Sequence, residues 1–184
     1  MQNRTRYLFD SDVLISSARL YYAPAYCQAF WDWLTAGHEA GLFYSIDKVK
    51  SELLNGDEDP LHKWALTDSL SDFFQKSLPA LAQWPRITEF ASCPEKNFTE
   101  AAKTKFLDVN KADAWLIAYA AHHGNYVIVT NEVPAPYSKH SIKLPDAAEQ
   151  LAVKTAKLHQ ICNIYAGHNF SLKAVETAIS HPNL

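Results

Sequence analysis

The sequence predicts an α/β fold built on a short, mainly parallel sheet. Two observations lead to this prediction. First, the runs 7–9 and 126–130 are apolar or β-branched without alternation, which is typical of strands buried on both faces. Second, helical stretches alternate with short strands along the chain. Such alternation favours right-handed crossovers between parallel strands.

The individual elements follow from local helix and strand signals. Gly41, Gly56 and Gly124 each end a helical stretch, and prolines divide the aromatic stretch 57–91 into short helices. The expected strands are 7–9, 42–44, 126–130 and 142–144. The other expected helices are 15–18, 26–40, 47–54, 98–106, 110–123, 155–165 and 171–179.

Length and composition indicate one globular domain. The chain has 184 residues, of which 48% are hydrophobic, and a domain of this size buries roughly 70% of its unfolded surface. We expect residues 1–165 to form the domain. Within it, residues 57–97 form a long helical insertion, and residues 166–184 follow as a C-terminal helical tail.

Charge and cysteine content limit the function classes. The net charge of −3 means that a nucleic-acid partner would need a local basic surface. Cys27, Cys93 and Cys162 are far apart and form no zinc-binding pattern, as expected of a reduced cytoplasmic protein. No apolar run has the length of a membrane span, so we expect a cytoplasmic protein without membrane contact.

Two acids directly follow the first predicted strand. Asp10 stands at its carboxyl end, where open α/β sheets bind their ligands. Asp12 comes two residues later, and capping the next helix is a sufficient alternative reason for an acid there. Asp10 is therefore the acid with the stronger functional interpretation.

Three further acids could reach the same place. Glu52 lies near the end of the predicted helix 47–54, and its alternative is a solvated pair with Lys48. Asp113 lies in the first turn of the next long helix, and its alternative is a capping box with the residue at 110. Glu132 follows the clearest strand, and its alternative is an ordinary loop acid.

Converging carboxylates need a counter-charge to stay ionised together. Their oxygens suit Mg²⁺ or Mn²⁺ rather than zinc. Such a cation lowers the pKa of a bound water and stabilises both oxygens of a phosphodiester displacement. The pattern thus predicts metal-dependent chemistry on a phosphate ester.

Four short motifs in this order resemble a PIN domain. They are Phe-Asp-Ser-Asp-Val-Leu-Ile at 9–15, Val-Lys-Ser-Glu-Leu at 49–53, Lys-Ala-Asp-Ala-Trp-Leu-Ile-Ala at 111–118 and Val-Ile-Val-Thr-Asn-Glu at 127–132. The aromatic Phe-Trp-Asp-Trp-Leu helix at 30–34 is similar to that of a group of bacterial PIN-like proteins. The resemblance implies a Rossmann-like α/β/α sandwich that cleaves RNA with Mg²⁺ or Mn²⁺.

The resemblance also implies roles for particular residues. Asp10, Glu52 and Asp113 match the three core acids, and Glu132 matches a fourth, so all four are expected to be catalytic metal ligands. Thr130 matches a small hydroxyl residue that supports the site. Asn131 and Asp12 are also placed beside the metal, although the family more often has Asn at position 12.

The same resemblance implies partners. Many relatives are toxins of bacterial toxin–antitoxin pairs, so we expect an RNA substrate and a cognate antitoxin, and the family often dimerises. Lys48, Lys50 and Lys111 flank the acids in sequence, as do Lys103 and Lys105, and they could meet the RNA backbone.

Two other functions remain open from the sequence. Phe-Asp-Ser-Asp at 9–12 also resembles the nucleophile motif of haloacid-dehalogenase-type phosphatases, in which Asp10 would attack phosphorus. That family needs a late pair of acids, which the Thr-Asn-Glu at 130–132 lacks. The second alternative is a non-catalytic, partner-binding protein on the same fold.

Overall fold

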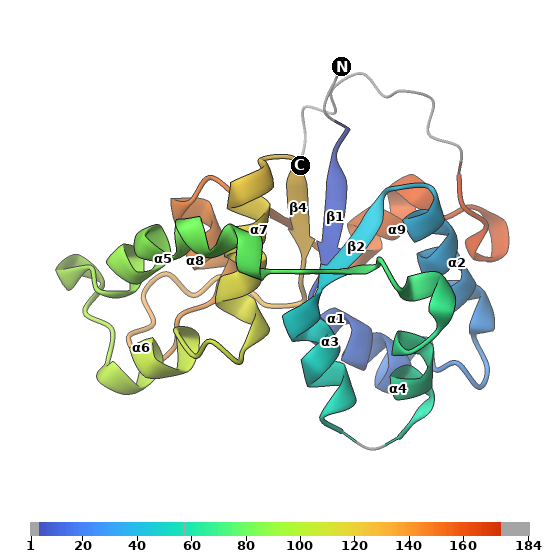
Figure 1. Ribbon diagram of the computed structural model, residues 1–184, viewed down its shortest axis with the longest axis horizontal. Coiled ribbons are helices and arrows are strands. Elements are labelled where there is room, and N and C mark those ends of the chain that lie inside the picture. The colour runs from blue at the N-terminus through green and yellow to red at the C-terminus, as the bar shows by residue number, and fades with distance from the viewer. Residues whose placement is uncertain (1–3, 57, 174–184) are drawn as a thin grey trace.

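The computed structural model describes residues 4–56 and 58–173. Within them, five parallel strands form one sheet in the order β3-β2-β1-β4-β5 (Figure 1). The strands are β1 (Arg6–Phe9), β2 (Phe43–Ile46), β3 (Phe74–Gln75), β4 (Tyr126–Val129) and β5 (Lys154–Ala156). The predicted α/β class with a parallel sheet is confirmed.

Helices and single helical turns connect these strands. The α-helices are α1 (Ser11–Ser16), α2 (Gln28–Glu39), α3 (Asp47–Leu54), α4 (Pro60–Ala65), α5 (Trp84–Ala91), α6 (Glu100–Phe106), α7 (Ala112–His123), α8 (Leu144–Gln150) and α9 (Leu158–Tyr165). A π-helical turn at Ser17–Tyr21 extends α1. The 3-10 turns are Asp68–Leu70, Leu78–Gln83, Pro94–Lys96 and His168–Phe170. None of the helices in the described residues is both long and apolar enough to cross a bilayer.

The sheet is buried on both faces. On one face, the Phe43 ring packs against Trp33 of α2 at 4.8 Å and Tyr165 of α9 at 5.8 Å between centroids. On the other face, Tyr126 packs against Tyr119 of α7 at 5.3 Å. Figure 1 shows α2 and α9 on one side of β1 and β4, and α7 on the other. Burial on both faces explains the uninterrupted apolar runs in the central strands.

A close approach fixes α2 on the sheet. A Cβ atom at Gly37 would lie 2.0 Å from Cδ2 of Phe43, so only glycine allows the helix to sit this near to β2. The chain then turns at Gly41, which has a φ of +72°, and enters β2. The helix stop expected at Gly41 is thus a turn that directs the chain into the sheet.

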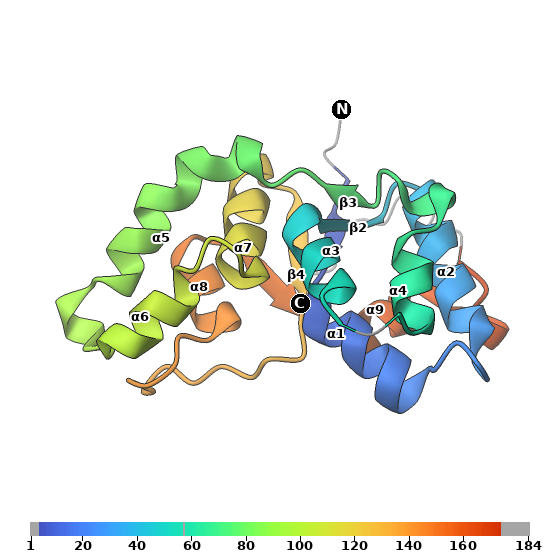
Figure 2. The same cartoon turned by 60° about the horizontal axis from the view of Figure 1, so that its bottom comes forward.

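The carboxyl ends of the parallel strands lie at one edge of the sheet. β1 lies between β2 and β4, with Leu8 opposite Tyr44 and Ile128. The chain leaves β1 directly into α1 and leaves β2 directly into α3, at the lower end of Figure 1. Figure 2 brings this edge toward the viewer, with α1, α3 and α7 grouped around it.

The structure departs from the expected elements in three places. The expected strand at 142–144 is absent, because residue 144 begins α8 and residues 141–143 are irregular. The expected helix at 155–165 begins only at Leu158, because residues 154–156 form β5 beside β4. The stretch 57–97 is also not purely helical, since it supplies the edge strand β3, which pairs with β2.

The expected tail helix at 171–179 falls mostly outside the described residues. Among those described, Leu172 forms an isolated antiparallel bridge with Ala166. Residues 171–173 are not helical.

Candidate active site at the carboxyl edge of the sheet

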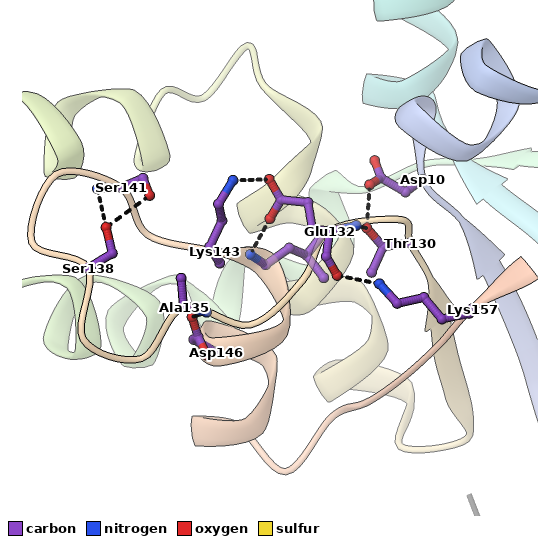
Figure 3. A network of polar contacts seen from close by, with 10 residues as sticks. Asp10, Thr130, Glu132, Ala135, Ser138, Ser141, Lys143, Asp146 and Lys157 are labelled. Atoms are coloured by element: carbon purple, nitrogen blue, oxygen red, sulfur yellow. Dashed lines mark hydrogen bonds and ion pairs between the residues drawn. The ribbon is translucent and has the colours of Figure 1, made fainter. Parts of the chain in front are cut away.

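Asp10 is held at the end of the central strand. Its backbone continues from β1 into the N-cap position of α1, and its side chain is only 3% exposed. The hydroxyl of Thr130, at the end of β4, donates to Oδ2 of Asp10 at 2.9 Å (Figure 3). Ser11 Oγ lies 3.4 Å from Oδ1. Asp10 is therefore a buried carboxylate whose short hydrogen bond comes from the neutral hydroxyl of Thr130.

Asp113 approaches from the neighbouring helix. It lies in the first turn of α7, whose N-cap is Lys111, with no side-chain cap hydrogen bond. The capping box with Asn110 is therefore wrong, and the Asp113 side chain lines a cavity instead. The helix N-terminus favours a carboxylate in this position electrostatically.

Burial and neighbouring acids raise the pKa values of both aspartates. Burial, then the charge of Asp113, raises the pKa of Asp10 from 3.8 to about 7, and the Thr130 hydroxyl opposes this rise. Burial, then Glu132 and Glu52, raises the pKa of Asp113 to about 6, while Lys105 and Lys111 lower it. Like charges that share a desolvated site behave in this way.

Glu52 connects the starts of two helices. Ser11 Oγ of α1 donates to its Oε2 at 2.6 Å, and the backbone N–H of Ala112 in α7 donates to its Oε1 at 3.1 Å. The alternative pair with Lys48 does not form. The Lys48 ammonium lies instead 5.7 Å from the centroid of the Trp115 ring. Glu52 thus faces the same edge as Asp10 and fastens α3 to α1 and α7.

Glu132 has a similar fastening role on the other side of the site. Its Oε2 accepts from the backbone N–H of Leu144, at the start of α8, at 2.7 Å, and its Oε1 lies 3.2 Å from Lys143 Nζ (Figure 3). Its backbone N–H donates to Thr130 Oγ1 at 3.2 Å, and its carbonyl accepts from Lys157 Nζ at 2.5 Å. Glu132 therefore links β4, α8 and the segment before α9.

A cavity of about 220 Å³ opens between these elements. Acids, lysines and apolar side chains share its lining, which consists of Glu52, Ala102, Lys105, Phe106, Lys111, Asp113, Glu132, Ser141, Ile142 and Lys143. Three of the four predicted acids line this cavity, and Asp10 couples to them electrostatically from its buried position.

The remaining predicted residues lie around this centre. Asp12 is exposed and accepts from Ser16 Oγ at 3.1 Å, while Asp10 takes the N-cap position that was expected for Asp12. Asn131 is half-buried beside Thr130. Lys50 lies 5.4 Å from the centroid of the Phe74 ring, and neither it nor Lys48 lines the cavity.

Sequence reasoning missed two residues of this site. Ser11 carries no functional role in the motifs described above, yet its hydroxyl donates to Glu52. Lys143 was assigned to a strand, yet it precedes α8 and pairs with Glu132. The Leu-Pro pair at 144–145 is a helix-start signal that could have placed Lys143 at an N-cap.

The donor set suits a hard cation in its chemistry. The converging groups are carboxylates and hydroxyls, with no histidine or cysteine among the cavity's lining residues. In the described part of the chain, however, no three acid, histidine or cysteine side chains are gathered closely enough to enclose a metal ion. A metal would therefore require these side chains to move toward one another.

The fold and this edge define the chain as a parallel α/β protein with carboxylates gathered at the carboxyl ends of its central strands. More specifically, the chain belongs to the family described as Domain of unknown function (DUF4411), which matches residues 7–164. The matched region contains all four acids. No curated protein and no solved structure was found to match the chain.

Proposed function

We propose that this protein is a PIN-like ribonuclease that hydrolyses RNA phosphodiester bonds with Mg²⁺ or Mn²⁺. One observation carries the proposal: acids from four distant parts of the chain converge on one sheet edge, and the pKa values of Asp10 and Asp113 are raised there. The parallel sheet is compatible with a PIN-like fold. The motifs that resemble that family supply these same acids.

The charge balance of Asp10 supports a cation at this site. Asp10 is almost fully buried, and the charges that raise its pKa come from three other acids. Within the described residues, its hydrogen bonds come only from hydroxyl and backbone groups. Asp10 and Asp113 would hold the cation, with Glu52 and Glu132 reaching it from either side. When bound, the cation would neutralise the phosphodiester and activate water for attack.

The chain's own groups would prepare the site. Thr130 orients Asp10 through its hydroxyl, and Glu52 fixes the starts of α1 and α7, which carry the two aspartates. These contacts fix the backbone elements that carry the carboxylates before the substrate arrives, although the carboxylate side chains would still have to move toward a bound cation.

The resemblance further leads us to propose a toxin role, with a cognate antitoxin protein as the partner. Expression of the wild-type chain alone in bacteria should then arrest growth, whereas expression of an Asp10→Asn variant should not. Equal growth under both conditions would remove the toxin role and leave the nuclease proposal intact.

The nuclease proposal is tested with purified protein and a labelled single-stranded RNA. We expect cleavage with Mg²⁺ or Mn²⁺ that leaves 5′-phosphate ends and is lost in excess EDTA and in Asp10→Asn. Cleavage that persists at full rate in EDTA would overturn the proposal. Trapping of beryllium fluoride on Asp10 would instead support the phosphatase alternative.

A further inference from the structure

Three lysines share the cavity with the acids. Lys105 comes from α6, Lys111 from the N-cap of α7 and Lys143 from the N-cap of α8. Lys105 and Lys111 belong to consecutive helices, and the fold brings the more distant Lys143 beside them on one side of the site. Figure 2 shows α6, α7 and α8 side by side at this end of the molecule.

Lys105 and Lys111 are free to bind an anion. Both are exposed, and neither forms an ion pair within the described residues. Both lower the pKa of Asp113, so their positive charges act directly on the acid cluster. Lys103, which the sequence also suggested, pairs instead with Glu100 at 2.7 Å.

Lys143 is held in position over the cavity. Its ammonium contacts Glu132 at 3.2 Å, and its side chain is 34% exposed. Glu132 is itself anchored through Thr130, Leu144 and Lys157. An ammonium has three N–H donors, so the contact with Glu132 leaves others for an incoming group.

We infer that Lys105, Lys111 and Lys143 bind the backbone phosphates of single-stranded RNA and align the scissile phosphate beside Asp113. This inference rests on the proposed nuclease function and deepens it by assigning the substrate-binding residues. A phosphodiester matches both halves of the cavity, because its charge meets the lysines on one side and a carboxylate-bound cation on the other. Lys48 and Lys50, which lie over aromatic rings outside the cavity lining, are not part of this set.

Salt dependence of RNA binding tests the inference. Affinity of the full chain for a fluorescent single-stranded RNA is measured by anisotropy in EDTA, across a range of salt concentrations. Each of Lys105→Ala, Lys111→Ala and Lys143→Met should make the negative slope of log association constant against log salt shallower by about 0.7, which corresponds to an affinity about fourfold weaker near 0.15 M salt. Lys143→Met keeps the length of the side chain, and thermal unfolding verifies that each variant is folded.

Lys63→Ala is the matched control. Lys63 is exposed on α4, which lies at the opposite end of the molecule from α6 in Figures 1 and 2, so its loss removes the same charge without touching the cavity. It should leave the slope unchanged. If the three cavity variants behave like Lys63→Ala, the inference is wrong.

Failure of this inference can be told apart from failure of the proposed function. Metal-dependent cleavage with unchanged RNA binding in the lysine variants would overturn the lysine assignment alone. Lysine-dependent RNA binding by a protein that never cleaves would support the lysine assignment and overturn the nuclease proposal. A wild-type chain that neither binds RNA nor cleaves it with Mg²⁺ or Mn²⁺ would overturn both.

Discussion

The aspartates and glutamates at this sheet edge are held in different ways. Asp10 and Asp113 lie at the centre with raised pKa values; Lys105 and Lys111 offset the charge of Asp113 only in part, and the charges that act on Asp10 come from other acids. Glu52 and Glu132 lie at the sides, and both oxygens of each accept hydrogen bonds that fasten helix N-termini. The difference shows that the glutamates hold the surrounding helices in place, whereas in the described part of the chain the two central aspartates accept no backbone N–H from a helix start.

This division leads to opposite expectations for activity and stability. Removing a charge from the centre should relieve repulsion and abolish function. Removing a glutamate from the side should leave donors unpaired and weaken the fold. Strained, charge-rich centres commonly carry such a trade-off between stability and activity.

The largest expected effect is that of Asp10→Asn on catalysis. Loss of a charged group at the centre should lower single-turnover RNA cleavage on the order of a thousandfold, because several kcal/mol of charge stabilisation is lost. The free energy of unfolding in EDTA should stay equal or rise. Asp12→Asn, at the exposed neighbouring acid, is the control and should keep most of the activity. A strongly destabilised Asp10→Asn protein would contradict the division.

Glu52→Ala should lower the free energy of unfolding, unlike Asp10→Asn. It leaves the Ser11 hydroxyl and the Ala112 N–H without their acceptor, which costs about 1–3 kcal/mol in the free energy of unfolding. Urea denaturation measures this loss. Lys50→Ala on the same helix is the control and should change stability less. Equal stabilities of Glu52→Ala and wild type would show that Glu52 does not fasten the helices.

Stability of the metal-free protein should fall as the pH rises from about 4 to about 7. The folded chain holds the proton of Asp10 up to a pKa of about 7, whereas the unfolded chain loses it near 3.8, so the folded state binds more protons in this window. Denaturation midpoints at several pH values measure the slope. Asp10→Asn should flatten it, and a slope that is identical in this variant would contradict the pKa assignment.

The smallest effect is expected for Glu132→Gln. The amide oxygen can still accept from Leu144 N–H, so only the partly exposed ion pair with Lys143 is lost, at about 0–1 kcal/mol. Glu132→Ala removes both contacts and should cost more in the same urea experiment. If the two variants were equally unstable, the ion pair rather than the helix contact would fasten this side.

The sequence predicted the parts of the fold that have strong local signals. β1 and β4 are buried, uninterrupted runs, and the helix expected at 47–54 coincides with α3. β3 has only two residues within an aromatic stretch, and β5 has only three. Neither is long enough to show the alternation of apolar and polar residues that identifies a strand. Short edge strands owe their conformation to pairing with a neighbour rather than to local preference.

The sequence pointed to the acids that lie at this sheet edge but not to their contacts. The order of the acids along the chain pointed to Asp10, Glu52, Asp113 and Glu132. The bonds of Glu132 to residues 143 and 144 depend on the path of the intervening loop, which no local pattern encodes. The same holds for the bond of Glu52 to α7, which joins residues 60 apart in sequence.

The most direct test of the central claim is a calorimetric titration of the purified protein with Mn²⁺, together with a calorimetric measurement of the unfolding temperature. Wild type should bind Mn²⁺ saturably and unfold at a higher temperature when it is bound, because a ligand of the folded state stabilises it. Asp10→Asn and Asp113→Asn should lose this binding, and the control Lys63→Ala should keep it. A wild-type protein that binds no Mn²⁺, or an Asp10→Asn variant that binds it equally well, would contradict the claim that the central aspartates are reserved for a cation.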